Sequence, residues 1–221
     1  TQLLCERWTL IVVREFIAGS TRFSELQKGV PLMSPTLLST RLKQLAKANV
    51  IEISGQKGDY TYTLTQAGRE LRPVVELLGA WGHRWVHSDL NNGDLDASLL
   101  MWDMRRSIDP SVFPKHKVVV QFEYFDAPKG AQNWWLVSDD GETDLCLNDH
   151  GHEINIIIKS TLKAMTAVWT CEQTFNQAVK KGDITVLGDN NLTNKLQDWL
   201  CTSPLSKLGT LPELPKLNWR V

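Results

Sequence analysis

Residues 33–52, MSPTLLSTRLKQLAKANVIE, predict an amphipathic helix that decides how the front of the chain folds. The Ser-Pro pair at 34–35 marks its start, because serine caps free N–H groups and proline suits the first helical position. Leu38, Leu42 and Leu45 recur at i, i+4 and i+7 and form one apolar stripe. At 3.6 residues per turn, four polar residues fall within about 60° of one another on the opposite side: Thr36, Thr40, Lys43 and Lys47. The helix alone leaves open whether this polar stripe meets solvent or a partner.

The segments around this helix predict a winged helix-turn-helix. An apolar helix is expected over residues 3–18 and a short helix over residues 22–28, separated from the next by Gly-Val-Pro. Strand-like residues 51–54 and 60–64 enclose GQKGD and predict a hairpin. A last helix is expected over residues 65–87. In a winged helix the second helix of the pair lies in the major groove of DNA, and the hairpin reaches a neighbouring groove or the backbone.

The same front half contains CERWTLIVVREFIAG, RFSELQKGVPLMSPTLLSTRLKQLAKANVIE and YTLTQAGREL. Over residues 5–75 these segments resemble the HxlR family of winged-helix transcriptional regulators. The resemblance implies binding of double-stranded DNA as a homodimer, with the first and last helices of the domain forming the dimer interface. The residues that could supply it are Trp8, Leu77, Leu78, Trp81 and Trp85. For the last four, packing against the second half of the chain is the alternative.

Many members of that family carry a sensing cysteine near the N-terminus. No cysteine precedes Trp8 at the corresponding distance, and Cys5 stands where relatives tend to have glycine. Redox sensing is therefore not expected of this chain.

The side chains expected to meet DNA carry hydroxyls or positive charge. Hydroxyls can bind phosphates or base edges, whereas lysines add salt-sensitive attraction to phosphates. The candidates are Arg22, Ser34, Pro35, Thr36, Ser39, Thr40, Arg41, Lys43, Lys47 and Lys57. Arg41 has a helical angle between those of Leu37 and Leu45, so a structural ion pair is an equal alternative for it.

Composition indicates two domains with different partners. The chain has 221 residues, of which 42% are hydrophobic and 22% charged, which is typical of a globular protein. The net charge of −1 combines about +4 over residues 1–88 with about −5 over residues 89–221. We therefore expect a winged-helix domain at 1–88, a polar linker at 89–97, a second domain at 98–202 and a Pro-rich tail at 203–221.

The location expected from the sequence is cytoplasmic. No apolar run reaches the length of a membrane span, and no signal-peptide pattern opens the chain. The four cysteines are far apart, as in reduced intracellular proteins.

The back half predicts an α+β domain with an antiparallel sheet. Helices are expected over residues 97–108, 160–170, 174–182 and 190–200, and strands over residues 117–126, 133–139, 143–149, 153–159 and 183–188. The pattern over residues 98–202 resembles the sterol-carrier-protein type of lipid-binding domain. That resemblance implies a tunnel for an apolar ligand such as a fatty acid, and binding rather than catalysis.

Six of the nine tryptophans lie in this half, which is compatible with an apolar cavity, although an ordinary core explains them as well. Candidate lining residues are Phe122, Tyr124, Trp135, Leu147, Ile156, Met165, Trp169 and Trp199.

No motif in the sequence predicts a metal, a cofactor or a catalytic residue. CLNDHGH clusters Cys146, Asp149, His150 and His152, but a turn between strands accounts for the same residues. His83 and His87 share a helix face without further ligands, and no nucleophile elbow or phosphate loop is found. The sequence therefore predicts a one-component DNA-binding regulator with an apolar ligand. The alternatives are a lipid carrier whose winged-helix head binds proteins, and an enzyme that uses the back-half cavity.

Overall fold

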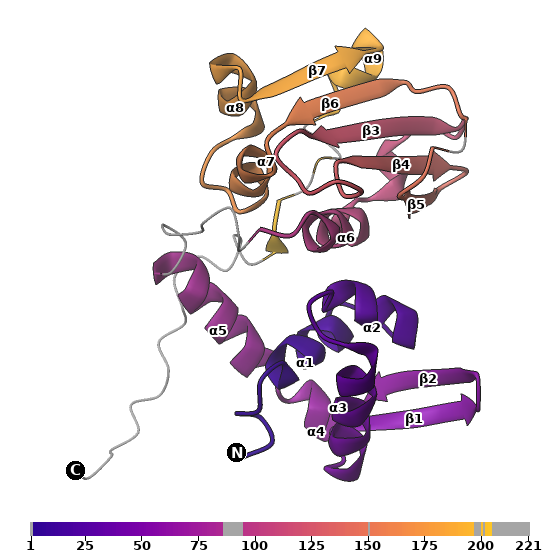
Figure 1. Ribbon diagram of the computed structural model, residues 1–221, viewed down its shortest axis with the longest axis vertical. Coiled ribbons are helices and arrows are strands. Elements are labelled where there is room, and N and C mark those ends of the chain that lie inside the picture. The colour runs from indigo at the N-terminus through magenta and orange to yellow at the C-terminus, as the bar shows by residue number, and fades with distance from the viewer. Residues whose placement is uncertain (1, 86–94, 150, 197–199, 201, 205–221) are drawn as a thin grey trace.

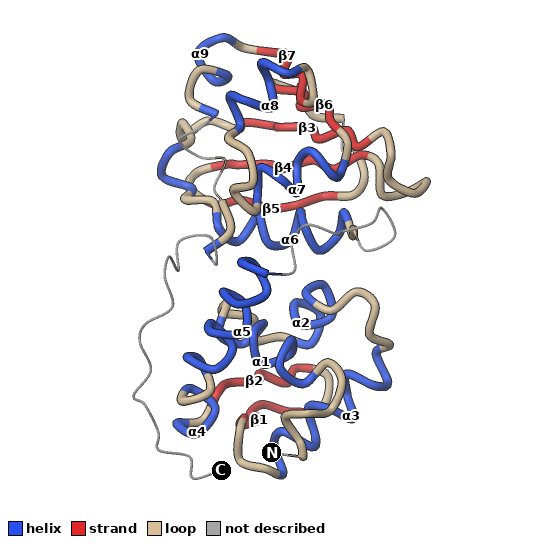
Figure 2. Tube along the Cα trace, turned by 90° about the vertical axis from the view of Figure 1, so that its left-hand side faces the viewer, coloured by secondary structure: helices blue, strands red, loops and turns tan. Residues whose placement is uncertain are grey.

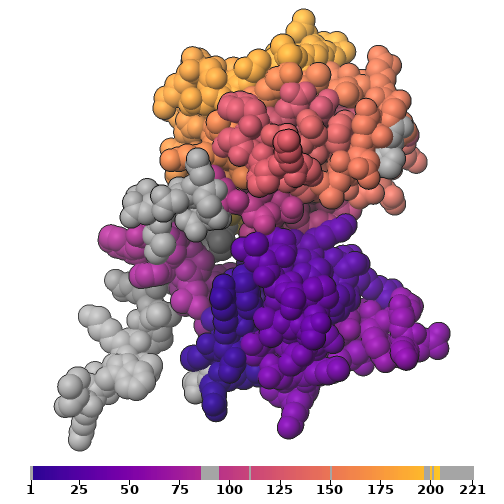
Figure 3. Space-filling view, in the orientation of Figure 1, coloured from indigo at the N-terminus to yellow at the C-terminus, as the bar shows by residue number. Residues whose placement is uncertain are grey.

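The computed structural model describes residues 2–85, 95–149, 151–196, 200 and 202–204, which form two lobes (Figures 1 and 3). Each lobe has its own cluster of buried apolar side chains. Among the residues that are placed, no helix combines the length and apolar character needed to cross a membrane.

The first lobe is a winged helix-turn-helix. Its elements are α1 (Thr9–Ile17), α2 (Phe23–Gly29), α3 (Pro35–Lys47), β1 (Ile51–Gln56), β2 (Asp59–Leu64), α4 (Gln66–Arg69) and α5 (Arg72–Trp85). The leucine stripe of α3 is fully buried and packs with Val12, Val13 and Leu26 of α1 and α2. The predicted order of helices and hairpin is confirmed.

Two boundaries in this lobe differ from the predicted ones. The first helix begins at Thr9 rather than residue 3, because Trp8 adopts a left-handed backbone conformation with φ of 76°. The last helix is broken into α4 and α5. Pro73 favours a restart there, because proline lacks the N–H that a continuous helix would use and is tolerated in a first turn.

The second lobe is an α+β layer structure. Its elements are α6 (Ala97–Ser107), a 3-10 turn (Pro110–Val112), β3 (Val118–Tyr124), β4 (Asn133–Asp139), β5 (Glu142–Cys146), β6 (Ile156–Ser160), α7 (Leu162–Trp169), α8 (Phe175–Lys181), β7 (Ile184–Gly188) and α9 (Asn190–Thr193). Helices α6, α7 and α8 lie on one face of the sheet (Figure 2), and their apolar side chains share one core with the inward side chains of the strands.

The sheet is mixed, so the prediction of an antiparallel sheet was wrong at one pair. Its strand order is β5-β4-β3-β6-β7, and β3 pairs with β6 in parallel, with Val120 opposite Ile156. The other three pairs are antiparallel. Among the described strands, β6 is not a hairpin partner of β5: it lies on the far side of β3 from β4 and runs parallel to β3. The predicted helix over residues 190–200 ends at Thr193 as α9, and residues 197–199 lie outside the described part.

Candidate nucleic-acid interface

The outer face of α3 is an exposed polar surface on a firmly held helix. Thr36, Thr40, Lys43 and Lys47 are all exposed, on the side of α3 opposite its buried leucines. Within the described ranges, no carboxylate lies within 4.0 Å of either lysine. In both views α2 lies between α3 and the second lobe (Figures 1 and 2), so the second lobe does not cover this face.

The start of α3 is capped as expected. Ser34 Oγ accepts a hydrogen bond from Leu37 N at 3.3 Å, and Pro35 occupies the first helical position. Thr40 Oγ1 donates to Thr36 O at 3.0 Å, which leaves its lone pairs free to accept from a partner. Ser39 is half-buried at the edge of the face.

The hairpin projects from the same lobe (Figure 1) and is tied to the loop before α2. Lys57 is exposed at its tip. Arg22 Nη1 pairs with Asp59 Oδ1 at 2.5 Å and donates to Tyr60 O at 3.4 Å, so its charge is partly used to hold the hairpin. A β-carbon at Gly55 would lie 2.4 Å from Asp59 O, which explains glycine at this point in the turn.

Arg41 does not belong to the exposed face. Its side chain is 5% exposed, and its guanidinium donates to Glu6 Oε2 at 3.4 Å, to Arg7 O at 3.2 Å and to Gln44 Oε1 at 2.8 Å. Of the two alternatives, the structure therefore supports the structural ion pair. We remove Arg41 from the candidate interface.

Leu37 flanks the polar stripe, about 60° beyond Thr40 around the helix, and its side chain carries no polar signal in the sequence. It is exposed near the start of α3. An apolar side chain at this position suits contact with a thymine methyl group in the major groove.

Comparison with known proteins supports the assignment of this lobe. The model of the HxlR-like helix-turn-helix family matches residues 3–90. The helix-turn-helix-type transcriptional regulator YvaP of Bacillus subtilis is 32% identical over 87 residues, which cover 38% of this chain and 81% of YvaP.

The chain belongs to the HxlR-like helix-turn-helix family.

Other relatives match the same front part of this HxlR-like protein. The regulator Rv3095 of Mycobacterium tuberculosis is 34% identical over 88 residues. That match covers 38% of this chain, and the chain spans only about half of Rv3095 (55%). The solved structure of reduced YodB from Bacillus subtilis matches at 27% identity and a TM-score of 0.35, covering 40% of this chain and 90% of YodB. The family match ends before the second lobe begins at α6.

One face of α5 carries an exposed apolar stripe in this HxlR-like protein. Leu78, Trp81 and Trp85 are 50%, 53% and 67% exposed, so the described part of the second lobe leaves at least half of each residue uncovered. Val74 is 43% exposed and extends the stripe one turn earlier. Its spacing of four residues from Leu78 is the sequence feature that places both on one helix face. Leu77 and Trp8 are half-buried.

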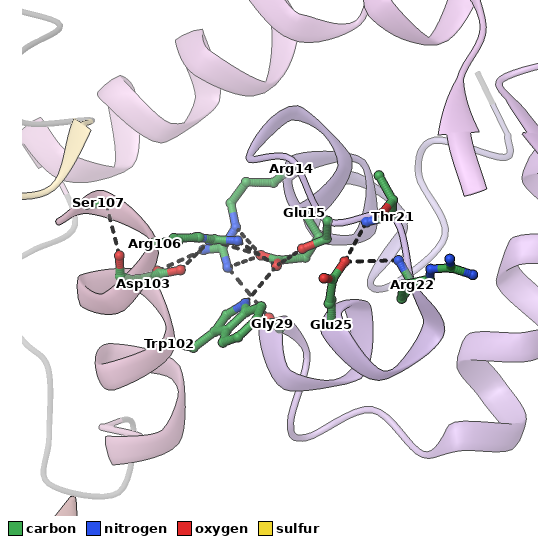
Figure 4. Close-up of polar contacts among 11 residues, drawn as sticks. Arg14, Glu15, Thr21, Arg22, Glu25, Gly29, Trp102, Asp103, Arg106 and Ser107 are labelled. Atoms are coloured by element: carbon green, nitrogen blue, oxygen red, sulfur yellow. Dashed lines mark hydrogen bonds and ion pairs between the residues drawn. The ribbon is translucent and has the colours of Figure 1, made fainter. Parts of the chain in front are cut away.

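A buried ionic cluster joins the two lobes (Figure 4). The Glu15 side chain on α1 is 0% exposed and accepts from Arg106 Nη1 of α6 at 2.7 Å and from Arg14 Nη2 at 2.6 Å. The indole N–H of Trp102 donates to Glu15 at 3.4 Å, and Arg106 also pairs with Asp103. The one sign of this cluster in the sequence is a glutamate, Glu15, inside the apolar run of α1.

The charges of this cluster shift the acidity of its members. Burial alone would raise the pKa of the Glu15 carboxyl, but hydrogen bonds and charge from Arg106 and Arg14 outweigh it and lower that pKa. Burial raises the pKa of the Asp103 carboxyl, although the positive charges of Arg14 and Arg106 act to lower it. Glu15 is therefore held as an anion between the lobes at neutral pH.

Four of the eight predicted ligand-lining residues are fully buried in the core. Phe122, Tyr124, Ile156 and Met165 have no accessible surface and lie within the packed cluster between sheet and helices. Side chains without accessible surface border no cavity large enough for water, so the prediction that these four line a tunnel was wrong.

The remaining predicted lining residues are spread over different surfaces. Trp135 is half-buried and alternates with buried Trp134, so it faces the other side of the sheet. Trp169 is buried in the same core cluster and also borders a cleft between the lobes, beside Arg14 and Arg106. Leu147 is exposed and borders a second cleft. Trp199 lies outside the described residues, as do His87 and His150 of the metal candidates. Among described residues, no three His, Cys, Asp or Glu side chains group as a metal site.

Proposed function

We propose that this HxlR-like protein is a transcriptional regulator that binds operator DNA as a homodimer. The observation that carries the proposal is the outer face of α3, where two hydroxyls and two lysines without described carboxylate partners are exposed together on a rigid helix. In a winged helix this face enters the major groove.

Each candidate side chain has a role set by its chemistry. Lys43 and Lys47, with Lys57 at the hairpin tip, neutralise phosphates and make binding salt-dependent. Thr36 and Thr40 offer hydroxyls to base edges or phosphates. Ser34, Pro35 and Ser39 position the start of the helix near the backbone, and Arg22 makes a secondary phosphate contact beside the tip end of the hairpin.

The dimer is proposed to form through α5, with α1 alongside it. The stripe formed by Val74, Leu78, Trp81 and Trp85 is large, apolar and exposed, which is typical of a surface covered by a partner. Two copies that pack these helices together would present two α3 helices to the half-sites of one operator.

The proposed division of the chain is a DNA-binding and dimerisation domain at 1–88, a linker at 89–97, a ligand-binding domain at 98–202 and a tail at 203–221. The sterol-carrier-like resemblance suggests an apolar ligand for the third segment. Because the core between the sheet and its helices is packed, the ligand is proposed to bind at a surface of this domain rather than in a tunnel.

A gel-shift titration against the DNA upstream of the protein's own gene tests the proposal. Replacing Thr36, Thr40, Lys43 and Lys47 together by alanine should abolish the shift. The matched control is Lys129→Ala/Lys180→Ala in the second lobe, where both lysines are exposed, and it should leave the shift unchanged. If the fourfold variant binds DNA with unchanged affinity, α3 does not enter the major groove through this face. That result would favour a first lobe that binds proteins.

A further inference from the structure

A second cleft lies where α2 of the first lobe meets α6 and the β4–β5 edge of the second. We call it the α2–α6 cleft; it has a volume of about 380 Å³. Volumes of about 300–1,000 Å³ are typical of small-molecule sites. The residues that matter for recognition are Lys28, Pro31, Trp102, Trp134, Leu145 and Leu147.

The wall contributed by the second lobe is aromatic and aliphatic. Trp102 and Trp134 are almost fully buried and rigidly held, since their indole N–H groups donate to Glu15 and to Ala131 O. Leu147 is exposed at the rim. An apolar body of one or two rings would be desolvated against this wall.

The first lobe contributes a positive charge. The Lys28 ammonium lies 5.0 Å from the ring centre of Trp102, and no described carboxylate lies within 4.0 Å of it. The neighbouring carboxylate of Asp144 is 3.9 Å from Arg105 instead. The charge of Lys28 is thus available to an anion whose apolar part occupies the cleft.

We infer that the α2–α6 cleft binds a small amphipathic organic anion, such as an aromatic carboxylate or sulfonate. Its anionic group pairs with Lys28, and its apolar body packs on Trp102, Trp134 and Leu147. The inference adds the location and the chemical class of the ligand to the proposed function. It rests on the proposed function only for the expectation that a ligand exists.

The location of the cleft connects the ligand to the DNA-binding element. Lys28 is in the last turn of α2, and Pro31 belongs to the turn that leads into α3. An occupant would touch this helix-turn-helix connection and the second lobe at the same time. Regulation requires the ligand to differ in affinity between two states of the protein.

Fluorescence titration of the full chain with two dyes, without DNA, tests the site. The anionic probe is 8-anilinonaphthalene-1-sulfonate, and the neutral probe is N-phenyl-1-naphthylamine, which lacks the sulfonate. Lys28→Met should weaken binding of the anionic dye roughly threefold to tenfold and leave the neutral dye unchanged. Lys180→Met, an exposed lysine on α8, is the matched control and should change neither.

A second variant keeps the test decisive. Ser98→Phe places a ring into the cleft from the first turn of α6 and should weaken both dyes, while thermal unfolding shows that the variant is folded. If Lys28→Met binds the anionic dye like the unaltered protein, or folded Ser98→Phe binds both dyes normally, the site is overturned. A failed gel shift with normal dye binding would count against DNA binding alone.

Discussion

Replacing Arg106 by methionine should weaken the joint between the lobes. Arg106 supplies two of the hydrogen bonds to the buried Glu15 carboxylate, at 2.7 and 3.2 Å. Removing one partner of a buried ion pair costs about 3–5 kcal/mol, because the remaining charge loses its compensation. Arg14 still contacts Glu15 at 2.6 Å, so we expect the lower end, about 3 kcal/mol of unfolding free energy.

The assay is urea unfolding followed by tryptophan fluorescence, with Arg105→Met as the matched control. Arg105 is the neighbouring residue on α6, but its guanidinium contacts Thr143 O and the largely exposed Asp144 carboxylate. Such a surface pair contributes about 1 kcal/mol or less. If Arg106→Met unfolds at the same urea concentration as Arg105→Met, the buried cluster does not stabilise the joint and this reasoning is wrong.

Three further predictions concern the buried Glu15 cluster and the exposed stripe of α5. Because the pKa of Glu15 is lowered in the folded protein, its stabilising contribution is present above the ordinary carboxyl pKa of 4.5 and is lost as pH falls through the lower folded value. The stability difference between the unaltered protein and Glu15→Gln, measured by thermal melts, should therefore narrow below about pH 4.5; a constant difference would contradict this. Gly29→Ala should cost about 1–3 kcal/mol because its β-carbon would lie 1.9 Å from Glu15 Oε2. Gly82→Ala, with open space around it on α5, should be neutral or stabilising in the same unfolding assay. If the two substitutions change the unfolding free energy equally, Gly29 does not pack closely against Glu15. Leu78→Lys/Trp81→Lys should yield monomers in sedimentation, and a persisting dimer would exclude the α5 stripe as its interface.

The first lobe was largely predictable because its signals are local. The Ser-Pro start of α3, the leucine stripe and the glycine-bearing hairpin each follow from neighbouring residues, and the structure reproduces them. Arg41 was ambiguous because its helical angle lies at the edge of the buried face. Its burial depends on Glu6 and Arg7, which precede α1 and reach back to α3.

The second lobe and the joint were less predictable because they depend on long-range contacts. Alternation identified β3 and β6 as strands but could not say that they pair in parallel, since strand order is decided by packing. The contact between Glu15 and Arg106 spans 91 residues. An aromatic residue on a strand looks the same in the sequence whether it packs in a core or lines a cavity. For this reason the sequence placed Phe122 and Tyr124 in a tunnel.

The salt dependence of operator binding tests the central claim most directly. Each neutralised phosphate contributes about 0.9 to the slope of log affinity against log salt concentration. Lys43→Ala/Lys47→Ala removes two phosphate contacts per protomer, so a dimer should bind more weakly, with a slope shallower by about 3 to 4. Lys129→Ala/Lys180→Ala should keep the original slope. If the Lys43→Ala/Lys47→Ala variant keeps both the affinity and the slope of the unaltered protein, α3 does not meet DNA through this face.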